Sequence, residues 1–154
     1  MPEAEPPATL GSWFPRSRRS PWLARRILRE LLAMVPDGDL RYSEVGELLA
    51  TELVANAVLH SGVPGRLIWV SFGVDATRLR IEVHDASERL PTPQRPDPTV
   101  GCGRGLLLVD ALATKWGHLP GPGGVGKVVW CECAPASQGG YSDGASCEHR
   151  TTGA

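Results

Sequence analysis

Three short stretches of the sequence combine residue types that can do chemistry. The first is ELVAN, in which Glu52 and Asn56 stand four residues apart, with His60 four residues further on. At about 100° per residue these side chains form one stripe along a helix. A carboxylate can activate a nucleophile as a general base, and an amide oxygen can hold a hydrated Mg²⁺. The stretch therefore predicts a cavity that holds a ligand or a metal ion.

A structural interpretation of ELVAN is the alternative. The helical wheel places the apolar side chains of Val45, Leu49 and Leu53 in the same sector as Glu52 and Asn56. The opposite sector, which we expect to face solvent, carries Glu44, Glu47 and Thr51. Both polar residues of the stripe could then be core groups that neighbouring backbone satisfies, or the helix could be less buried than its pattern suggests. A buried carboxylate without a partner is costly, so we favour the functional interpretation.

The other two stretches lie at the ends of expected elements. HDAS places Asp85 at the end of a strand, where its carboxylate can accept a hydrogen bond deep in a pocket. GCGRGLLLV carries Gly101, Gly103 and Gly105 ahead of a helix that begins near Leu106, whose free N–H groups can bind phosphates. Each signal alone is weak, because a Gly-x-Gly often marks a turn and Asp85 could simply end its strand. The glycines match neither a Walker motif nor a Rossmann fingerprint.

Two helices are expected before the first well-marked strand. Residues 20–35 begin with Ser20 as the predicted N-cap and Pro21 at the first helical position, and their apolar side chains recur at helical spacing. A turn at residues 36–39 separates them from the long helix of about residues 40–60, which carries ELVAN.

Strands are expected from apolar patterns on both sides of a long loop. The located strands are residues 8–14 (weakly marked), 66–74, 78–85 and 127–134. The loop, residues 86–105, is rich in proline and glycine and leads to a short helix at residues 106–116. The order β α α β β, loop, α β β predicts an α+β fold: a two-layer sandwich with a mostly antiparallel sheet and helices on one face.

Composition narrows the class of protein. With 154 residues, a net charge of −1 and a pI of about 6.4, the chain suits one domain without a basic field for direct binding to nucleic acid or to an anionic membrane. It shows neither a signal peptide nor an apolar run of membrane-spanning length, so we expect a cytoplasmic protein. Residues 1–7 and 135–154 are expected to be disordered. Zinc spacing is absent among the cysteines, which we expect to be free thiols: Cys102, Cys131, Cys133 and Cys147.

Taken together and in this order, the three stretches resemble the GHKL superfamily of ATPases. Its members share the Bergerat fold and include DNA gyrase, the heat-shock chaperone ATPase, histidine kinases and mismatch-repair MutL. Within it the chain is most similar, over residues 8–134, to the small stand-alone anti-sigma-factor serine/threonine kinases and their actinobacterial relatives. The ending GKVVWCE also looks like the closing strand of this subfamily. The resemblance implies ATP as the ligand and Mg²⁺ as its cofactor.

The resemblance also implies a role for each candidate residue. Glu52 and Asn56 fit the N box, with Glu52 as general base and Asn56 for Mg²⁺, while His60 lines the site at the helix end. Asp85 fits the G1 position, whose carboxylate receives the adenine amino group. Next to the phosphates, the G2 box is matched by Gly103, Arg104, Gly105 and Leu106, with Gly101 in the preceding lid of residues 88–102. Ser87 departs from the family, since a glycine often stands there, and it could crowd or hydrogen-bond the nucleotide.

Two functions follow as expectations from this resemblance. One is a serine/threonine protein kinase that transfers the γ-phosphate of ATP to a partner protein. The other is a non-catalytic module that sequesters a sigma factor or another regulator when ATP is bound. The expected partners are ATP or ADP together with a sigma factor or an antagonist protein, and the family often forms homodimers. Histidine autokinase activity is not expected, because no helix with a phosphoacceptor histidine precedes the domain.

Overall fold

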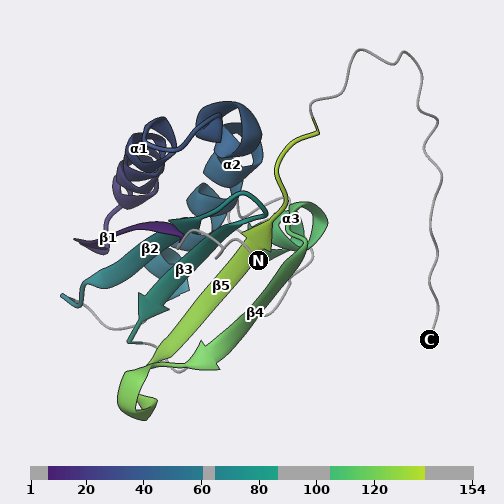
Figure 1. The fold of residues 1–154 in the computed structure, drawn as a ribbon. Helices are drawn as coiled ribbons and strands as arrows, with labels where there is room; N and C mark the ends of the chain where they lie inside the picture. The colour runs from purple at the N-terminus through teal and green to yellow at the C-terminus, as the bar shows by residue number, and fades with distance from the viewer. Residues whose placement is uncertain (1–6, 61–64, 87–104, 138–154) are drawn as a thin grey trace, which may run out of the picture.

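A computed structural model describes residues 7–60, 65–86 and 105–137 of the chain. Within these residues it forms a five-stranded sheet with the helices packed on one face (Figure 1). The elements in chain order are β1 (Ala8–Phe14), α1 (Ser20–Ala33), α2 (Gly38–His60), β2 (Ile68–Val74), β3 (Leu79–Asp85), α3 (Gly105–Leu112), β4 (Lys115–Pro120), a 3-10 turn η1 (Pro122–Gly124) and β5 (Lys127–Cys133). The predicted α+β two-layer fold is confirmed.

The sheet has the order β1-β2-β3-β5-β4, and each neighbouring pair of strands is antiparallel. Residues of β2 and β3 alternate strictly between buried and half-buried positions, because only one face of the sheet is covered. In β3 the buried positions are Leu79, Ile81, Val83 and Asp85. The last of them is a carboxylate, which therefore lies on the helix-covered face of the sheet.

The helices α1 and α2 pack against each other and against the sheet. Gly46 of α2 lies where the two helices meet β3, and a Cβ atom at this position would come within 2.7 Å of Leu79 and 3.3 Å of Leu28. The missing side chain thus allows a close approach between α2 and its neighbours. At the start of α1, Ser20 is the first helical residue, and its hydroxyl donates to the carbonyl oxygen of Pro15. The prediction that Ser20 caps the helix is therefore wrong, because Arg19 occupies the N-cap position and no side chain caps the helix.

The last helix is shorter than the sequence suggested. It ends at Leu112, and β4 begins at Lys115, so the predicted helix over residues 106–116 is wrong in its last turn. Thr114 explains the change, since its backbone N–H and its hydroxyl both donate to the carbonyl oxygen of Glu132, at 2.8 and 3.0 Å. These two bonds attach the chain to β5 and start the β4–β5 pairing.

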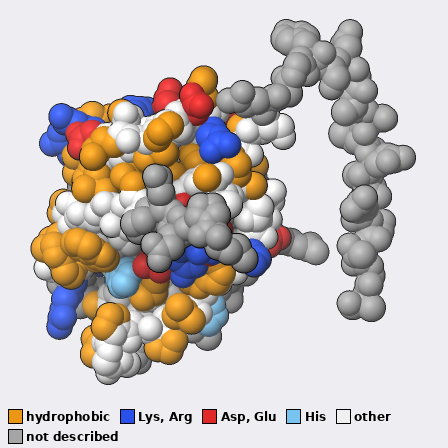
Figure 2. All heavy atoms as spheres, in the orientation of Figure 1, with side chains coloured by type: hydrophobic (Ala, Val, Ile, Leu, Met, Phe, Trp, Pro, Cys, Tyr) orange, Lys and Arg blue, Asp and Glu red, His pale blue; other side chains and the backbone are white. Residues whose placement is uncertain are grey.

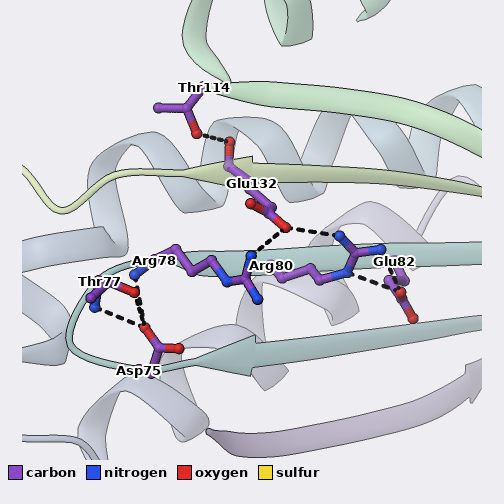
Figure 3. Close-up of polar contacts among 7 residues, drawn as sticks. All are labelled: Asp75, Thr77, Arg78, Arg80, Glu82, Thr114 and Glu132. Carbon is purple, nitrogen blue, oxygen red and sulfur yellow. Dashed lines mark hydrogen bonds and ion pairs between the residues drawn. The ribbon is translucent and has the colours of Figure 1, made fainter. Parts of the chain in front are cut away.

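The face of the sheet without helices carries charged residues that satisfy one another. Arg78 and Arg80 each donate to Glu132 at 2.9 Å, and Arg80 also donates to Glu82 at 3.0 Å (Figure 3). The Arg80 guanidinium stacks 4.4 Å from the ring of Trp130. Basic and acidic side chains are interspersed with hydrophobic ones on this side of the molecule (Figure 2). The charged groups of this face are thus already paired with one another. The predicted ligand site is expected on the opposite, helix-covered face, where Asp85 lies.

Among the described residues, no helix is long and apolar enough to cross a membrane.

Candidate functional site

Helix α2 presents a different face to the core from the one that the helical wheel indicated. Its fully buried side includes the small residues Gly46, Ala50 and Ala57 together with larger apolar ones. Glu52 and Asn56 are half-buried and lie at the edge of this face rather than at its centre. The wheel was misleading because small residues allow the closest contacts but contribute little to a hydrophobic pattern. The large side chains that flank the stripe are well exposed, at 45% for Leu48 and 48% for Leu59.

The polar side of α2 is also not simply a solvent face. Glu47 forms an ion pair with Arg29 of α1, and the hydroxyl of Thr51 accepts a hydrogen bond from Arg25 at 3.2 Å. The arginines of α1 thus bind the neighbouring helix. Glu47 and Thr51 were expected to face solvent, but these contacts show that they face α1. Glu52 lies on a different side of α2.

Glu52 has the electrostatic character of a base. Desolvation raises the pKa of its carboxyl group above the ordinary value, and no charge or hydrogen-bond donor among the described residues counteracts that shift. A carboxylate with a raised pKa accepts a proton more readily near neutral pH than an exposed one does. Such perturbed groups concentrate at functional sites.

Asn56 offers the amide oxygen that a magnesium ion can use. It stands one turn after Glu52 on α2 and is half-buried. No group of three or more His, Cys, Asp or Glu side chains among the described residues could enclose a metal ion. A site with a single protein oxygen fits Mg²⁺, which keeps several waters and binds largely through substrate phosphates.

Asp85 lies buried at the end of β3, with its side chain 1% exposed. Lys127 faces it from the start of β5, and its ammonium nitrogen lies 3.7 Å from the Oδ2 atom of Asp85. Gly126 has a φ of +67° and passes so close to β3 that a Cβ atom there would lie 2.0 Å from the carbonyl oxygen of Asp85. The backbone therefore fixes the two charged residues as cross-strand neighbours. Sequence reasoning missed Lys127, although a charge at an inward position of an apolar strand was a signal.

The predicted elements meet on the helix-covered face of the sheet. Helix α2 packs against β3, β5 and α3, so the helix with Glu52 and Asn56 adjoins the strands with Asp85 and Lys127. Helix α3 begins at Gly105, and Leu106 is buried, at 5% exposed.

Not every predicted residue is brought into this arrangement. His60 is the last residue of α2 and is exposed. Four predicted site residues lie outside the described residues: Ser87, Gly101, Gly103 and Arg104. Their roles, and those of the lid around them, stay predictions.

Comparison with known families identifies the class of this domain. The chain matches the histidine kinase-like ATPase domain over residues 17–130, a range that runs from just before α1 into β5 and contains all three chemical stretches. The match covers most of the chain, so the chain belongs to the histidine kinase-like ATPase family, within the GHKL superfamily. Domains of this kind bind ATP, usually together with Mg²⁺. No match was found among curated proteins.

Proposed function

We propose that the protein is an ATP-dependent serine/threonine protein kinase of the anti-sigma-factor type. Its substrate would be a hydroxyl group on a partner regulator, either a sigma factor or an antagonist protein. The observation that carries the proposal is Glu52, a half-buried carboxylate whose pKa is raised by desolvation alone and which stands one turn before Asn56. A base at this position makes phosphoryl transfer possible, whereas binding of ATP alone does not require one.

Phosphoryl transfer requires little of the protein beyond positioning the reactants and neutralising charge. The hydroxyl oxygen of the partner forms a bond to the γ-phosphorus, the bond from that phosphorus to the β,γ-bridging oxygen breaks, and ADP leaves. Glu52 takes the proton that the hydroxyl loses. Asn56 would hold Mg²⁺, whose charge offsets that of the phosphates. Asp85 accepts from the adenine amino group and so orients the nucleotide. Phosphoryl transfer by positioning and charge neutralisation suits a domain of this size.

The test is transfer of labelled phosphate from ATP–Mg²⁺ to a candidate antagonist protein. We expect Glu52→Gln to lower transfer by about 10²–10⁴-fold, the usual contribution of a general base, while ATP affinity stays nearly constant. Glu30→Gln is the matched control, since Glu30 is an exposed helix residue, with its side chain 61% exposed, in an i,i+4 pair with Arg26. This control should keep both activities.

Two results would contradict the kinase. If Glu52→Gln abolishes ATP binding, Glu52 positions the ligand or the fold, and the base mechanism fails. If the wild-type protein transfers no phosphate but binds its partner only in the presence of ATP, the protein is the sequestering module instead. Thermal melts without ligand separate these outcomes from simple misfolding, because a misfolded variant shows no cooperative transition.

A further inference from the structure

The Asp85–Lys127 pair places a hydrogen-bond acceptor beside a hydrogen-bond donor at the end of the sheet. The two residues face each other across β3 and β5, with 3.7 Å between the ammonium nitrogen and Oδ2. Their side chains are 1% and 5% exposed, so neither charge is dispersed by bulk water. Gly126, next to Lys127, passes so close to β3 that a Cβ atom there would lie 2.0 Å from the carbonyl oxygen of Asp85.

Adenine carries the complementary pair of groups. Its 6-amino group is a donor, and a ring nitrogen acceptor lies on either side of it, N1 on one edge and N7 on the other. The amide side chains of Asn and Gln read adenine in DNA by this principle, with an oxygen that accepts from the amino group and a nitrogen that donates to N7. A carboxylate and an ammonium group side by side offer the same two functions.

We propose that Lys127 is a specificity-determining residue of the nucleotide site, whose ammonium group donates a hydrogen bond to a ring nitrogen of adenine while Asp85 accepts from the amino group. The inference rests on the proposed binding of ATP at this site, and it adds a second contact to the base. Guanine carries a carbonyl oxygen in place of the amino group, so Asp85 opposes it when the base lies in the same orientation.

A purely structural ion pair is the competing interpretation. Two buried charges gain little stability over apolar residues of similar volume, because desolvation offsets their attraction. A pair kept only for stability would therefore have small benefit here. Under this interpretation Lys127 influences the nucleotide only through the charge and the position of Asp85.

The experiment measures whether the contribution of Lys127 to ATP affinity depends on the adenine ring nitrogen that it would contact. Calorimetry compares ATP with 7-deaza-ATP and 1-deaza-ATP, each of which lacks one ring nitrogen and keeps the amino group. We expect the wild-type protein to bind one of these analogues about ten- to a hundredfold more weakly than ATP, as for a lost hydrogen bond to a charged donor. In Lys127→Met, ATP should be weakened by a similar factor, and that analogue should lose nothing further.

A second variant covers the case in which Lys127→Met does not fold. Lys127→Arg keeps the charge opposite Asp85 but presents its donors in a different geometry. We expect it to bind ATP at least about tenfold more weakly than the wild type does, whereas a role limited to charge pairing predicts unchanged affinity.

Three results would overturn the inference. The first is equal affinity of the wild-type protein for ATP and both analogues. The second is an analogue penalty that persists unchanged in Lys127→Met, and the third is full ATP affinity in Lys127→Arg. The proposed function fails separately, if the folded wild-type protein binds no ATP at all.

Discussion

Replacing Asn56 by Ala distinguishes a ligand-binding amide from a structural one. Asn56 is half-buried on α2, and no hydrogen bond joins its side chain to another described residue. Truncation therefore leaves no described partner unsatisfied, and alanine is the better helix former by up to about 0.7 kcal/mol. The melting temperature without ligand should stay the same or rise by up to about 3 °C, since ~1 kcal/mol corresponds to ~2–4 °C at this chain length.

Leu53→Ala provides the contrast on the same helix. Leu53 is 1% exposed, and truncation of a buried leucine costs about 2–5 kcal/mol. Its melting temperature should fall by about 4–20 °C. The change in melting temperature should therefore differ between the two variants in sign or in size, although the two residues are only three positions apart.

Thermal melts with ATP, with and without Mg²⁺, complete the assay. At a ligand concentration a hundred times its Kd, binding stabilises the wild-type protein by about 2.7 kcal/mol, or roughly 5–10 °C. Asn56→Ala should lose the part of this shift that depends on Mg²⁺, whereas Leu53→Ala should keep it. A large loss of stability in Asn56→Ala together with an unchanged Mg²⁺-dependent shift would refute the assignment, because Asn56 would then be a satisfied core residue.

Three further predictions concern the fold around the site. Gly126→Ala should lower stability by more than about 2 kcal/mol in thermal melts, because its Cβ would meet the carbonyl oxygen of Asp85. The control Gly65→Ala is also at positive φ but has nothing within 4 Å, so it should cost only about 1 kcal/mol. Similar losses in the two variants would contradict the close contact at Gly126. Because the pKa of Glu52 is raised in the folded protein, the folded state keeps this proton to higher pH, and stability falls as pH rises through the raised pKa. Glu52→Gln should therefore melt at a higher temperature than the wild type at neutral pH, and this difference should vanish in acid. A difference that stays constant with pH would disprove the raised pKa. Burial raises the pKa of the Cys131 and Cys133 thiols of β5. Iodoacetamide should therefore label at most two of the four cysteines in the native protein and all four after denaturation. Rapid labelling of three cysteines in the native protein would contradict the burial of these two thiols.

The sequence predicted the elements whose patterns are local. The apolar pattern of β3 located the strand that ends at Asp85, and the spacing of apolar residues located α1 and α2. Strand β4 was expected in the chain order, but its residues were not identified. Five of its six residues are polar, glycine or exposed, and among the described strands it pairs only with β5. Its strand state is imposed by that partner, which no local pattern reveals.

The sequence suggested which residue types could form the site, but it did not predict how the described ones lie against their neighbours. Glu52 and Asn56 were expected at the centre of the apolar face, whereas small residues of α2 determine where the helix meets its neighbours. Lys127 becomes the neighbour of Asp85 only through the register of β3 against β5, which joins positions 42 residues apart. Such a pairing depends on tertiary structure, and a single sequence carries no direct signal of it.

Calorimetric titration of ATP and of GTP, into the wild-type protein and into Asp85→Asn, tests most directly whether Asp85 recognises adenine. A site built to accept from the amino group leaves its carboxylate facing the carbonyl oxygen of guanine. We expect the wild-type protein to bind ATP at least about a hundredfold more tightly than GTP. Asp85→Asn should lose most of that affinity for ATP. Equal affinity of the wild-type protein for ATP and GTP would contradict the assignment of Asp85 and, with it, the proposed orientation of the nucleotide.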